Sequence, residues 1–320
     1  MLEFFLAIVI FLHQYRYMKI FSGSANKPLA SKIANELGLS LSPVEHHVFP
    51  DGEQRVMIKD EVLGQHCVIV QPTSPPVDKH YMELFLLIDA LKRSGATNVT
   101  VVIPYIGYMR QDHVFRSGEA RSLEVVARTM EECGGDIFMA VDVHSIKIPS
   151  IFEKPFVHVS ALPIFAEKIK ELGWSKEDTV LVSPDMGGIN RVSKIAELCG
   201  DMKYAAVEKN RDLVSGSVAA DTIHGDTKKR AIIIDDMIAS GGTIKTACDL
   251  LTSKGVEEII VMATHAVFAK EAPEILEASL AQKIYVTDTI EVSESKMFSK
   301  LEIISLSQSI SDRIKEIEED

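Results

Sequence analysis

Short apolar runs alternate with amphipathic segments along most of the chain. The first run, residues 18–21, is followed by a polar loop and then by an amphipathic stretch from Pro28 to Leu37, with Gly38 just beyond it. Proline in the first turn and glycine after the last turn are typical start and stop signals of a helix. Because this unit of strand, loop and helix recurs, the sequence predicts an α/β fold in which mainly parallel sheets are flanked by helices.

Two stretches of the sequence resemble each other at a constant offset. Residues 91–95 end in glycine and lead into the apolar run 99–103, and residues 251–255 lead into 259–263 in the same way. The repeat predicts two similar halves, made by duplication, with a boundary near residues 150–165. The alternative is chance similarity, since generic units of helix and strand share their turn chemistry. A length of 320 residues also suits two cores better than one.

The charge and the cysteine content exclude several classes of partner. The net charge is −12 and the pI is near 5.4, so the overall field repels nucleic acid and anionic membranes. We therefore expect no nucleic acid and no membrane partner. The four cysteines are scattered and show neither a CxxC pair nor metal-ligand spacing, which is typical of buried thiols in a reducing compartment such as the cytoplasm.

The first seventeen residues do not fit either common N-terminal targeting element. The apolar run from Phe4 to Leu12 is shorter than the roughly 20 residues that span a bilayer. Glu3 stands where a signal peptide is basic, and no cleavage site of small residues follows. Since a well-formed strand begins abruptly at Met18, we interpret Met18 as the natural start and residues 1–17 as an extension that is not native.

The most informative segment runs from Ala231 to Ile244. Four apolar residues predict a central strand, and Asp235 and Asp236 follow at its carboxyl end, before a loop of small residues and a helix from about Thr243. Ligands of open α/β sheets bind at that end of the strands.

Each part of this segment suits one part of a phosphorylated sugar. The backbone N–H groups of residues 240–243, at a helix N-terminus, form a cradle for a phosphate monoester. The two carboxylates would repel that phosphate, so we expect them to accept hydrogen bonds from sugar hydroxyls or to share a metal with them. The alternative is a solvated strand end before a glycine turn.

This segment resembles the phosphoribosyl pyrophosphate motif that phosphoribosyltransferases share with ribose-phosphate pyrophosphokinases. The motif alone does not distinguish the two families. The opening segment Phe21-Ser-Gly-Ser-Ala-Asn26 is similar to the latter family, and the similarity extends over roughly residues 18–315. Five further motifs occur in the order seen in ribose-phosphate pyrophosphokinases: Phe49-Pro-Asp-Gly-Glu53, Tyr108-Met-Arg-Gln-Asp112, Val141-Asp-Val-His144, Ser183-Pro-Asp-Met-Gly-Gly188 and Lys209-Asn-Arg211.

The resemblance implies a fold and an activity. It implies two tandem phosphoribosyltransferase-type domains, residues 18–160 on the ATP side and residues 161–320 on the ribose 5-phosphate side. The activity would be transfer of the pyrophosphoryl group of ATP to the C1 hydroxyl of ribose 5-phosphate, giving phosphoribosyl pyrophosphate and AMP for nucleotide biosynthesis. Mg²⁺ would be the cofactor, and the enzyme would be a cytoplasmic homo-oligomer built from dimers.

The resemblance also implies a role for individual residues. Lys209 and Arg211 would be catalytic, and His144 and Asp185 would hold the magnesium, although histidine is an unusual ligand for this ion. The residues implied to bind ATP are Phe49, Asp51, Glu53, Arg110, Gln111 and His144, the first three contributed by a neighbouring subunit. The residues implied to bind ribose 5-phosphate are Asp235, Asp236, Ala239, Ser240, Gly241, Gly242 and Thr243.

The chemistry of these residue types agrees with those roles. An arginine can clamp phosphate oxygens or stack on a base. Pyrophosphoryl transfer builds charge on phosphate oxygens, which positioned cations stabilise. Lys209 and Arg211 precede the small-residue stretch 215–221, which we expect to be a mobile loop that closes and excludes water.

Some of these motifs have plainer interpretations when taken alone. Residues 49–53 are typical of a tight surface turn, residues 209–211 of a solvated basic turn, and a lone histidine of a packing residue. Two other functions remain as alternatives. A phosphoribosyltransferase would need only one such domain and a base-recognition hood, and a catalytically silent paralogue would bind nucleotide and regulate an active partner. Departures from the common family pattern at residues 113–116 and 145–149 leave allosteric control and a hexameric state open.

Overall fold

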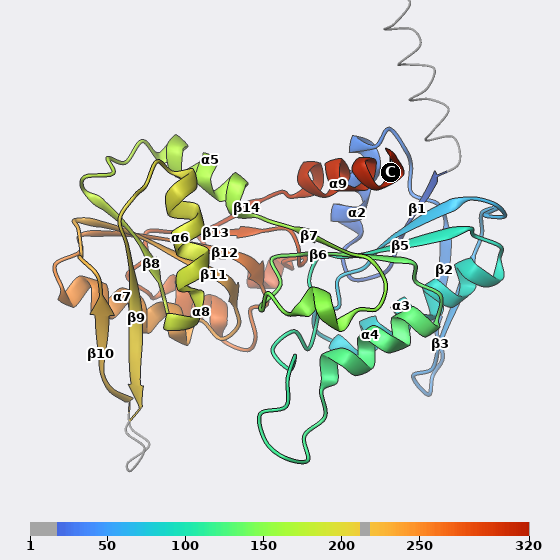
Figure 1. The fold of residues 1–320 in the computed structure, drawn as a ribbon, viewed down its shortest axis with the longest axis horizontal. Helices are drawn as coiled ribbons and strands as arrows, with labels where there is room; N and C mark the ends of the chain where they lie inside the picture. The colour runs from blue at the N-terminus through green and yellow to red at the C-terminus, as the bar shows by residue number, and fades with distance from the viewer. Residues whose placement is uncertain (1–17, 212–217, 320) are drawn as a thin grey trace, which may run out of the picture. The chain divides into compact units, whose positions relative to one another are not determined.

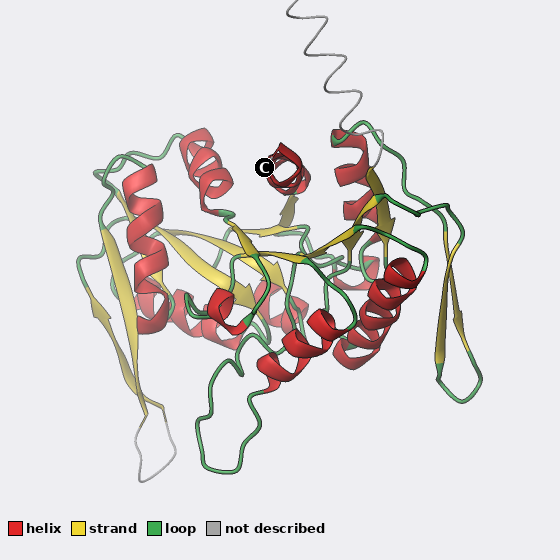
Figure 2. Ribbon diagram, turned by 45° about the vertical axis from the view of Figure 1, so that its right-hand side comes forward, coloured by secondary structure: helices red, strands yellow, loops and turns green. Residues whose placement is uncertain are grey.

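The computed structural model describes residues 18–211 and 218–319. The expected fold is confirmed there, because two mainly parallel sheets each carry helices on both faces (Figures 1 and 2). The chain divides into two compact units. None of the described helices is long and apolar enough to cross a membrane. The prediction that residues 1–17 are not native lies outside the described residues.

The first unit contains a parallel sheet of five strands. In spatial order they are β1 (Met18–Ser22), β4 (His66–Val70), β5 (Asn98–Ile103), β6 (Ile137–Val141) and β7 (Phe156–Val159). Helices α2 (Lys27–Glu36) and α9 (Ser307–Glu319) lie on one face, and α3 (Val77–Arg93) and α4 (Ser122–Glu132) on the other (Figure 1). An antiparallel hairpin, β2 (Val44–Val48) and β3 (Gln54–Ile58), forms a separate sheet, and a 3-10 turn, η2 (Ile148–Ile151), precedes β7.

The second unit contains a sheet of seven strands, parallel except for the pair β9–β10. In spatial order they are β10 (Val218–His224), β9 (Tyr204–Arg211), β8 (Thr179–Ser183), β11 (Arg230–Ile238), β12 (Glu258–Ala266), β13 (Lys283–Thr287) and β14 (Leu301–Ile304). Helices α5 (Leu162–Leu172) and α6 (Ile189–Leu198) cover one face, and α7 (Gly242–Ser253) and α8 (Ala272–Glu277) the other (Figure 1). Two 3-10 turns are η3 (Met186–Gly188) and η4 (Glu294–Lys296).

The two sheets repeat one topology. The parallel order β1-β4-β5-β6-β7 of the first unit corresponds to β8-β11-β12-β13-β14 of the second. In both units a helix and then a hairpin follow the first strand, α2 with β2–β3 and α6 with β9–β10. The predicted similarity of the halves is therefore visible in the topology, whereas their origin by duplication stays a prediction.

The apolar runs found in the sequence form the centre of each sheet. Ile232, Ile233 and Ile234 of β11 are fully buried, and the strand pairs with β12 along all three and with β8 as far as Ile233. A strand buried on both faces is uniformly apolar, because helices cover both sides of a parallel sheet. This explains why the run is continuous and does not alternate with polar residues.

The last helix, α9, belongs to the first unit. Its buried residues Ile310 and Ile314 lie on the side that contacts α2 and β7. The ring Nδ1 of His66, at the start of β4, contacts the carboxyl oxygen Oε1 of Glu318 in the last turn. The domain boundary expected between residues 160 and 161 assigned this helix to the second domain. The sequence of a terminal amphipathic helix does not specify the domain on which it packs, because that depends on contacts with distant segments.

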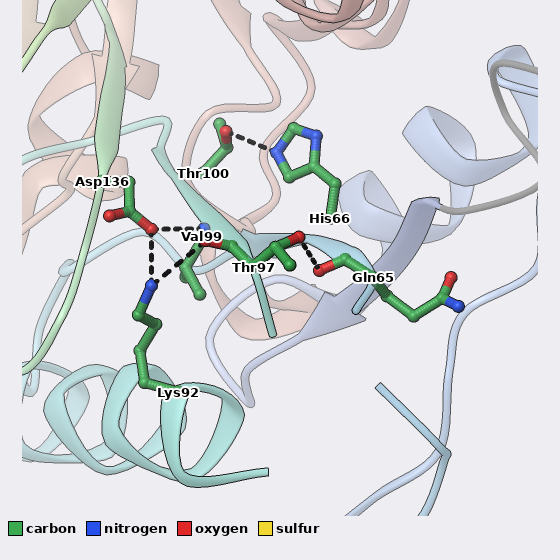
Figure 3. A network of polar contacts seen from close by, with 7 residues as sticks. All are labelled: Gln65, His66, Lys92, Thr97, Val99, Thr100 and Asp136. Atoms are coloured by element: carbon green, nitrogen blue, oxygen red, sulfur yellow. Dashed lines mark hydrogen bonds and ion pairs between the residues drawn. The ribbon is translucent and has the colours of Figure 1, made fainter. Parts of the chain in front are cut away.

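A polar network ties together the amino ends of β4, β5 and β6 (Figure 3). The carboxylate oxygen Oδ2 of Asp136 accepts hydrogen bonds from the backbone N–H of Val99 at 2.8 Å and from Nζ of Lys92 at 3.0 Å. The ring Nε2 of His66 lies 2.9 Å from Oγ1 of Thr100. Burial lowers the pKa of His66 to about 4, so the ring is neutral at physiological pH. This network lies at the edge opposite the strands' carboxyl ends, and we interpret it as structural.

Two of the four cysteines are fully buried, and we expect them to be unreactive in the native protein. Burial raises the pKa of both Cys67 and Cys248 to about 12. Because the thiolate is the nucleophile, iodoacetamide at neutral pH should leave both residues unmodified in native protein and label them after unfolding in guanidinium. Mass spectrometry of tryptic peptides measures this directly. Rapid labelling of either residue without unfolding would contradict the buried placement.

Candidate active site

The acid pair of β11 lies where one neighbouring strand has ended and the other continues. The pairing of β11 with β8 stops at Ile233, opposite Val182. Its pairing with β12 continues through Asp235 to Ile238. On the side of β8, Asp235 and Asp236 therefore lie beyond the last paired residues of the sheet.

The sequence interpretation placed the end of this strand at Ile234, and the structure corrects it. β11 extends to Ile238 because β12 is equally long and pairs with it as far as Ala266. Met237 and Ile238 are buried. Residues of β11 therefore precede and follow the acid pair, and pairing with β12 fixes the backbone of the pair more firmly than a loop would.

The loop between β11 and α7 has the expected form. Ala239 accepts a hydrogen bond from the N–H of Ala269 at 2.8 Å, which anchors the loop at its start. Gly241, the N-cap of α7, has φ +79°, and a Cβ there would lie 3.2 Å from Leu276 Cγ. Only glycine adopts this conformation without strain. With Ser240, Gly242 and Thr243 it forms the helix start that the sequence predicted, and such a start suits a phosphate.

The loop after β8 carries Asp185 at the same edge of the sheet. Asp185 is exposed, and its Oδ1 accepts a hydrogen bond from the N–H of Gly188 at 3.1 Å. The hydroxyl of Ser183 donates to the carbonyl oxygen of Asp185 at 2.6 Å. β8 is the strand from which the chain crosses first to β9 and later to β11, so its carboxyl end is the switch point at which open α/β sheets bind ligands.

Lys209 and Arg211 occupy alternate positions near the end of β9. The register pairs Ser183, the last residue of β8, with Ala206, so β9 continues past the end of β8 as β11 does. Arg211 is paired with Val218 of β10. The predicted mobile stretch 215–221 is only partly described: residues 218–221 belong to β10, and residues 215–217 lie outside the described part of the chain.

Arg191 is a residue of this edge that sequence reasoning missed. It lies in the first turn of α6, and its guanidinium forms ion pairs with both carboxylates of the acid pair. Burial first, and then the Asp236 carboxylate, raise the pKa of Asp235 well above its usual range, and Arg191 opposes this shift. A signal was present in the sequence, because a cation in the first turn of a helix is unfavourable unless an anion faces it.

In the first unit, residues 49–53 form the turn of the β2–β3 hairpin. The N–H of Phe49 donates to the carbonyl oxygen of Glu53 at 2.8 Å, and Oδ1 of Asp51 accepts from the N–H of Glu53 at 3.1 Å. Phe49 is 37% exposed although the ring of His47 contacts it. The turn predicted from the residues is confirmed, and the exposed ring is available to a ligand or to another chain.

Arg110 and Gln111 follow β5 on a segment that is anchored just before them. Oγ1 of Thr73 accepts a hydrogen bond from the N–H of Gly107 at 2.7 Å. The hydroxyl of Tyr81 donates to the carbonyl oxygen of Gly107 at 2.8 Å, and burial raises the pKa of Tyr81, which keeps that proton in place. Both side chains that the sequence singled out are exposed beyond this anchor.

His144 is exposed beyond the carboxyl end of β6, as expected of a residue that meets a ligand. The sequence interpretation carried that strand to Val143, but β6 ends at Val141. The chain turns at Asp142, which has φ +34° and is buried, with an oxygen 3.7 Å from Nε2 of His158. A left-handed residue cannot continue a strand, so His144 stands on a loop.

Within each unit the structure brings predicted residues to one edge of a sheet. In the second unit, Asp185, Lys209, Arg211 and the segment 235–243 all lie at or beyond the carboxyl end of β8 or its two neighbours. In the first unit, Arg110, Gln111 and His144 follow the adjacent strands β5 and β6, whereas residues 49–53 lie on the separate hairpin.

The donors of the second unit fit a hard divalent cation. Among the described residues, no group of three His, Cys, Asp or Glu side chains could hold a metal by itself. Mg²⁺ does not need such a group, since it keeps several waters and is usually bound by one or two carboxylates together with substrate phosphates. The exposed carboxylate of Asp185, beside a glycine loop suited to phosphate, meets that requirement.

Two family models match the chain. Residues 18–134 match the N-terminal domain of ribose phosphate pyrophosphokinase, and residues 208–320 match the phosphoribosyl synthetase-associated domain.

Curated relatives match over nearly the whole chain. The ribose-phosphate pyrophosphokinase of Fusobacterium nucleatum is 39% identical over 303 residues, which are 95% of this chain and 96% of that protein. Ribose-phosphate pyrophosphokinase 1 of Streptococcus mutans is 37% identical over 307 residues and covers 95% of each chain. The crystal structure of phosphoribosylpyrophosphate synthetase from Mycobacterium smegmatis superimposes with a TM-score of 0.89 at 31% identity, covering 95% of this chain and 99% of that one.

Proposed function

The chain belongs to the ribose-phosphate pyrophosphokinase family, and from that premise we propose that it makes phosphoribosyl pyrophosphate and AMP from ribose 5-phosphate and ATP. The observation that carries this function is the similarity to such enzymes over almost the full length of both chains. The arrangement of the second unit agrees with it, since a phosphate cradle and an acid pair occupy consecutive positions of one segment.

The reaction is one displacement at phosphorus. The C1 hydroxyl oxygen of ribose 5-phosphate bonds to the β-phosphorus of ATP, and the bond from that phosphorus to the oxygen shared with the α-phosphate breaks. AMP leaves with that oxygen, and the hydroxyl proton is released. Because little covalent chemistry is left to the protein, catalysis depends on positioning and on stabilising the charge that builds on the phosphate oxygens.

Ribose 5-phosphate is held, in this proposal, by the segment from the acid pair to the start of α7. The N–H groups of Ser240, Gly241, Gly242 and Thr243 face the 5-phosphate, with Ala239 at the loop's anchored start. Asp235 and Asp236 accept hydrogen bonds from the ribose hydroxyls.

Lys209 and Arg211 are proposed as the catalytic cations. Both positions belong to the part of β9 that runs past the carboxyl end of β8, beside the loop that carries Asp185. Cations there would face the transferred group while ribose is bound at β11. They would stabilise charge that is larger in the transition state than in either substrate.

ATP is proposed to bind to the first unit through Arg110, Gln111 and His144. Phe49, Asp51 and Glu53 would come from a second copy of the chain, which makes the enzyme a homo-oligomer built from dimers. The hairpin that carries them supports this, since it forms a sheet of its own and exposes Phe49, Val48 and Met57. The scattered free cysteines suit a reducing compartment, and we place the enzyme in the cytoplasm.

Mg²⁺ is the proposed cofactor, with Asp185 and His144 as the protein groups that hold it. Bound with ATP, the ion would neutralise the phosphates and orient them. The carboxylate of Asp185 also accepts a hydrogen bond from the N–H of Gly188, so the loop itself orients this carboxylate.

The test is an assay of AMP formation from ATP with Mg²⁺, with and without ribose 5-phosphate, and with the product identified by phosphorus NMR. We expect AMP in equal amounts to a product that carries a pyrophosphoryl group on C1 of ribose, and no AMP when ribose 5-phosphate or Mg²⁺ is omitted. No AMP, but binding of ribose 5-phosphate or nucleotide, would contradict the proposal and favour a silent regulatory paralogue. Release of pyrophosphate from phosphoribosyl pyrophosphate on addition of a free base would favour a phosphoribosyltransferase.

A further inference from the structure

The guanidinium of Arg191 spans the acid pair of β11. Its Nη1 lies 3.8 Å from Oδ1 of Asp235, and its Nη2 lies 3.5 Å from Oδ2 of Asp236. The three side chains are largely buried, with exposures of 17% for the arginine and of 14% and 6% for the two aspartates. One cation therefore serves two adjacent carboxylates in a site with little solvent.

The location of Arg191 on its helix is unfavourable without these partners. It is in the first turn of α6, where the helix dipole repels cations, and burying its long side chain costs conformational entropy. Two adjacent carboxylates repel each other in the same way, which favours protonation of one of them, and the charge of Arg191 opposes this tendency. The three groups are stable together because each offsets the cost of the others.

The same guanidinium also borders the loop after β8. A Cβ added to Gly188 would lie 3.5 Å from Nη1 of Arg191, so the arginine sits directly beside the end of the loop that carries Asp185. From the first turn of α6, Arg191 thus contacts the acid pair on β11 and lies beside Gly188, which follows Asp185 in the loop after β8. It therefore connects the two elements, β11 and this loop, that each carry part of the site.

We propose that Arg191 is a positioning residue for ribose 5-phosphate, which orients both carboxylates of the acid pair so that their oxygens accept hydrogen bonds from the sugar hydroxyls. The inference rests on the proposed function, because it assigns the acid pair to the ribose. Arg191 acts through Asp235 and Asp236 and does not touch the transferred phosphoryl group.

The variant Arg191→Gln tests this role by separating the two substrates. Because small displacements of positioning groups can cost on the order of 10- to 100-fold, we expect the KM for ribose 5-phosphate to rise by about that factor, with a smaller fall in kcat and an unchanged KM for ATP. Calorimetric titration with ribose 5-phosphate alone should show the same loss of affinity. A merely structural role of Arg191 would not weaken the binding of one substrate selectively.

Two further variants sharpen the comparison. Arg191→Lys keeps the charge but offers a single ammonium that cannot span both carboxylates, so it should recover part of the lost affinity. Arg230→Gln is the matched control. Arg230 forms an ion pair with Glu258 at 2.7 Å at the opposite end of the same strand, and its loss should leave both KM values unchanged. Circular dichroism and the melting temperature check that each variant is folded.

Three outcomes overturn the inference. A wild-type KM for ribose 5-phosphate in folded Arg191→Gln excludes the positioning role, and so does a fall in kcat with unchanged ribose 5-phosphate affinity, which would put the guanidinium on the transferred group. If the glutamine variant does not fold, the lysine variant decides by the same criterion. If the wild-type enzyme forms no product, the proposed function fails, and titration with ribose 5-phosphate still tests the inference; no binding by the wild type overturns both.

Discussion

Replacing Arg211 with alanine is expected to lower kcat by at least about 100-fold, because arginines that stabilise phosphoryl-transfer transition states contribute roughly 10³ to 10⁵ in rate. The affinity for ribose 5-phosphate should change little. The groups proposed to bind that substrate lie on β11 and at the start of α7, whereas Arg211 is the last residue of β9. The effect should therefore appear in kcat and in kcat/KM to the same extent, as expected when an interaction exists only in the transition state.

The measurement is steady-state AMP formation with each substrate varied in turn. Lys209→Ala should behave in the same way, since the two residues occupy alternate positions of one strand. Asn210→Ala, at the position between them, is the matched control and should retain most of its activity. A nearly normal kcat in Arg211→Ala would exclude the catalytic role of Arg211. A loss of equal size in Asn210→Ala would show that the loss of activity comes from a disturbed hairpin and not from the missing cation.

The architecture could be predicted because it depends on local patterns. The continuous run of isoleucines in β11 is what burial on both faces requires, and the glycine turns after helices mark their ends. The order of the segment from Asp235 to Thr243 was sufficient to propose a phosphorylated sugar. Each of these features is contained in about fifteen consecutive residues, so no knowledge of long-range contacts was needed.

Two of the errors about the fold involve partners that are distant in sequence, and a third comes from the backbone conformation of one residue. β11 extends to Ile238, past its own acid pair, because β12 is long enough to pair with it. β6 ends two residues early because Asp142 adopts a left-handed conformation. Helix α9 packs on α2, from which it is separated by most of the chain. Pattern within a segment does not specify where its neighbour ends or which surface it covers.

The site shows the same limit. Sequence reasoning identified the acid pair and the loop at Asp185 separately, but the arginine that connects them lies on a helix that follows only one of them. Its position in the first turn of α6 was a usable signal only once an anion was known to face it. The same holds for residues 49–53: the turn follows from Pro50 and Gly52, whereas the role proposed for the exposed ring of Phe49 would require a second chain.

Gly107→Ala is expected to raise the KM for ATP on the order of 100-fold while leaving the affinity for ribose 5-phosphate unchanged. A Cβ at this position would lie 2.7 Å from the carbonyl oxygen of Thr73 and 2.7 Å from Cγ1 of Val77. The backbone oxygen cannot move aside as a side chain could, so the segment must shift. Arg110 and Gln111 follow within four residues, and the shift would displace both from the ATP that we propose they bind.

Gly118→Ala controls for the effect of the substitution itself. Gly118 lies in the same connection, with open space around the position of a Cβ, and its φ of +91° makes alanine unfavourable by about 1–2 kcal/mol. It should lower the melting temperature slightly without a selective effect on ATP. Tyr81→Phe removes only the hydrogen bond to Gly107 and should give a smaller rise in the KM for ATP than Gly107→Ala. If Gly107→Ala weakens the binding of ribose 5-phosphate as much as that of ATP, the segment matters for the fold of the whole enzyme. The assignment of Arg110 and Gln111 to ATP then loses its support.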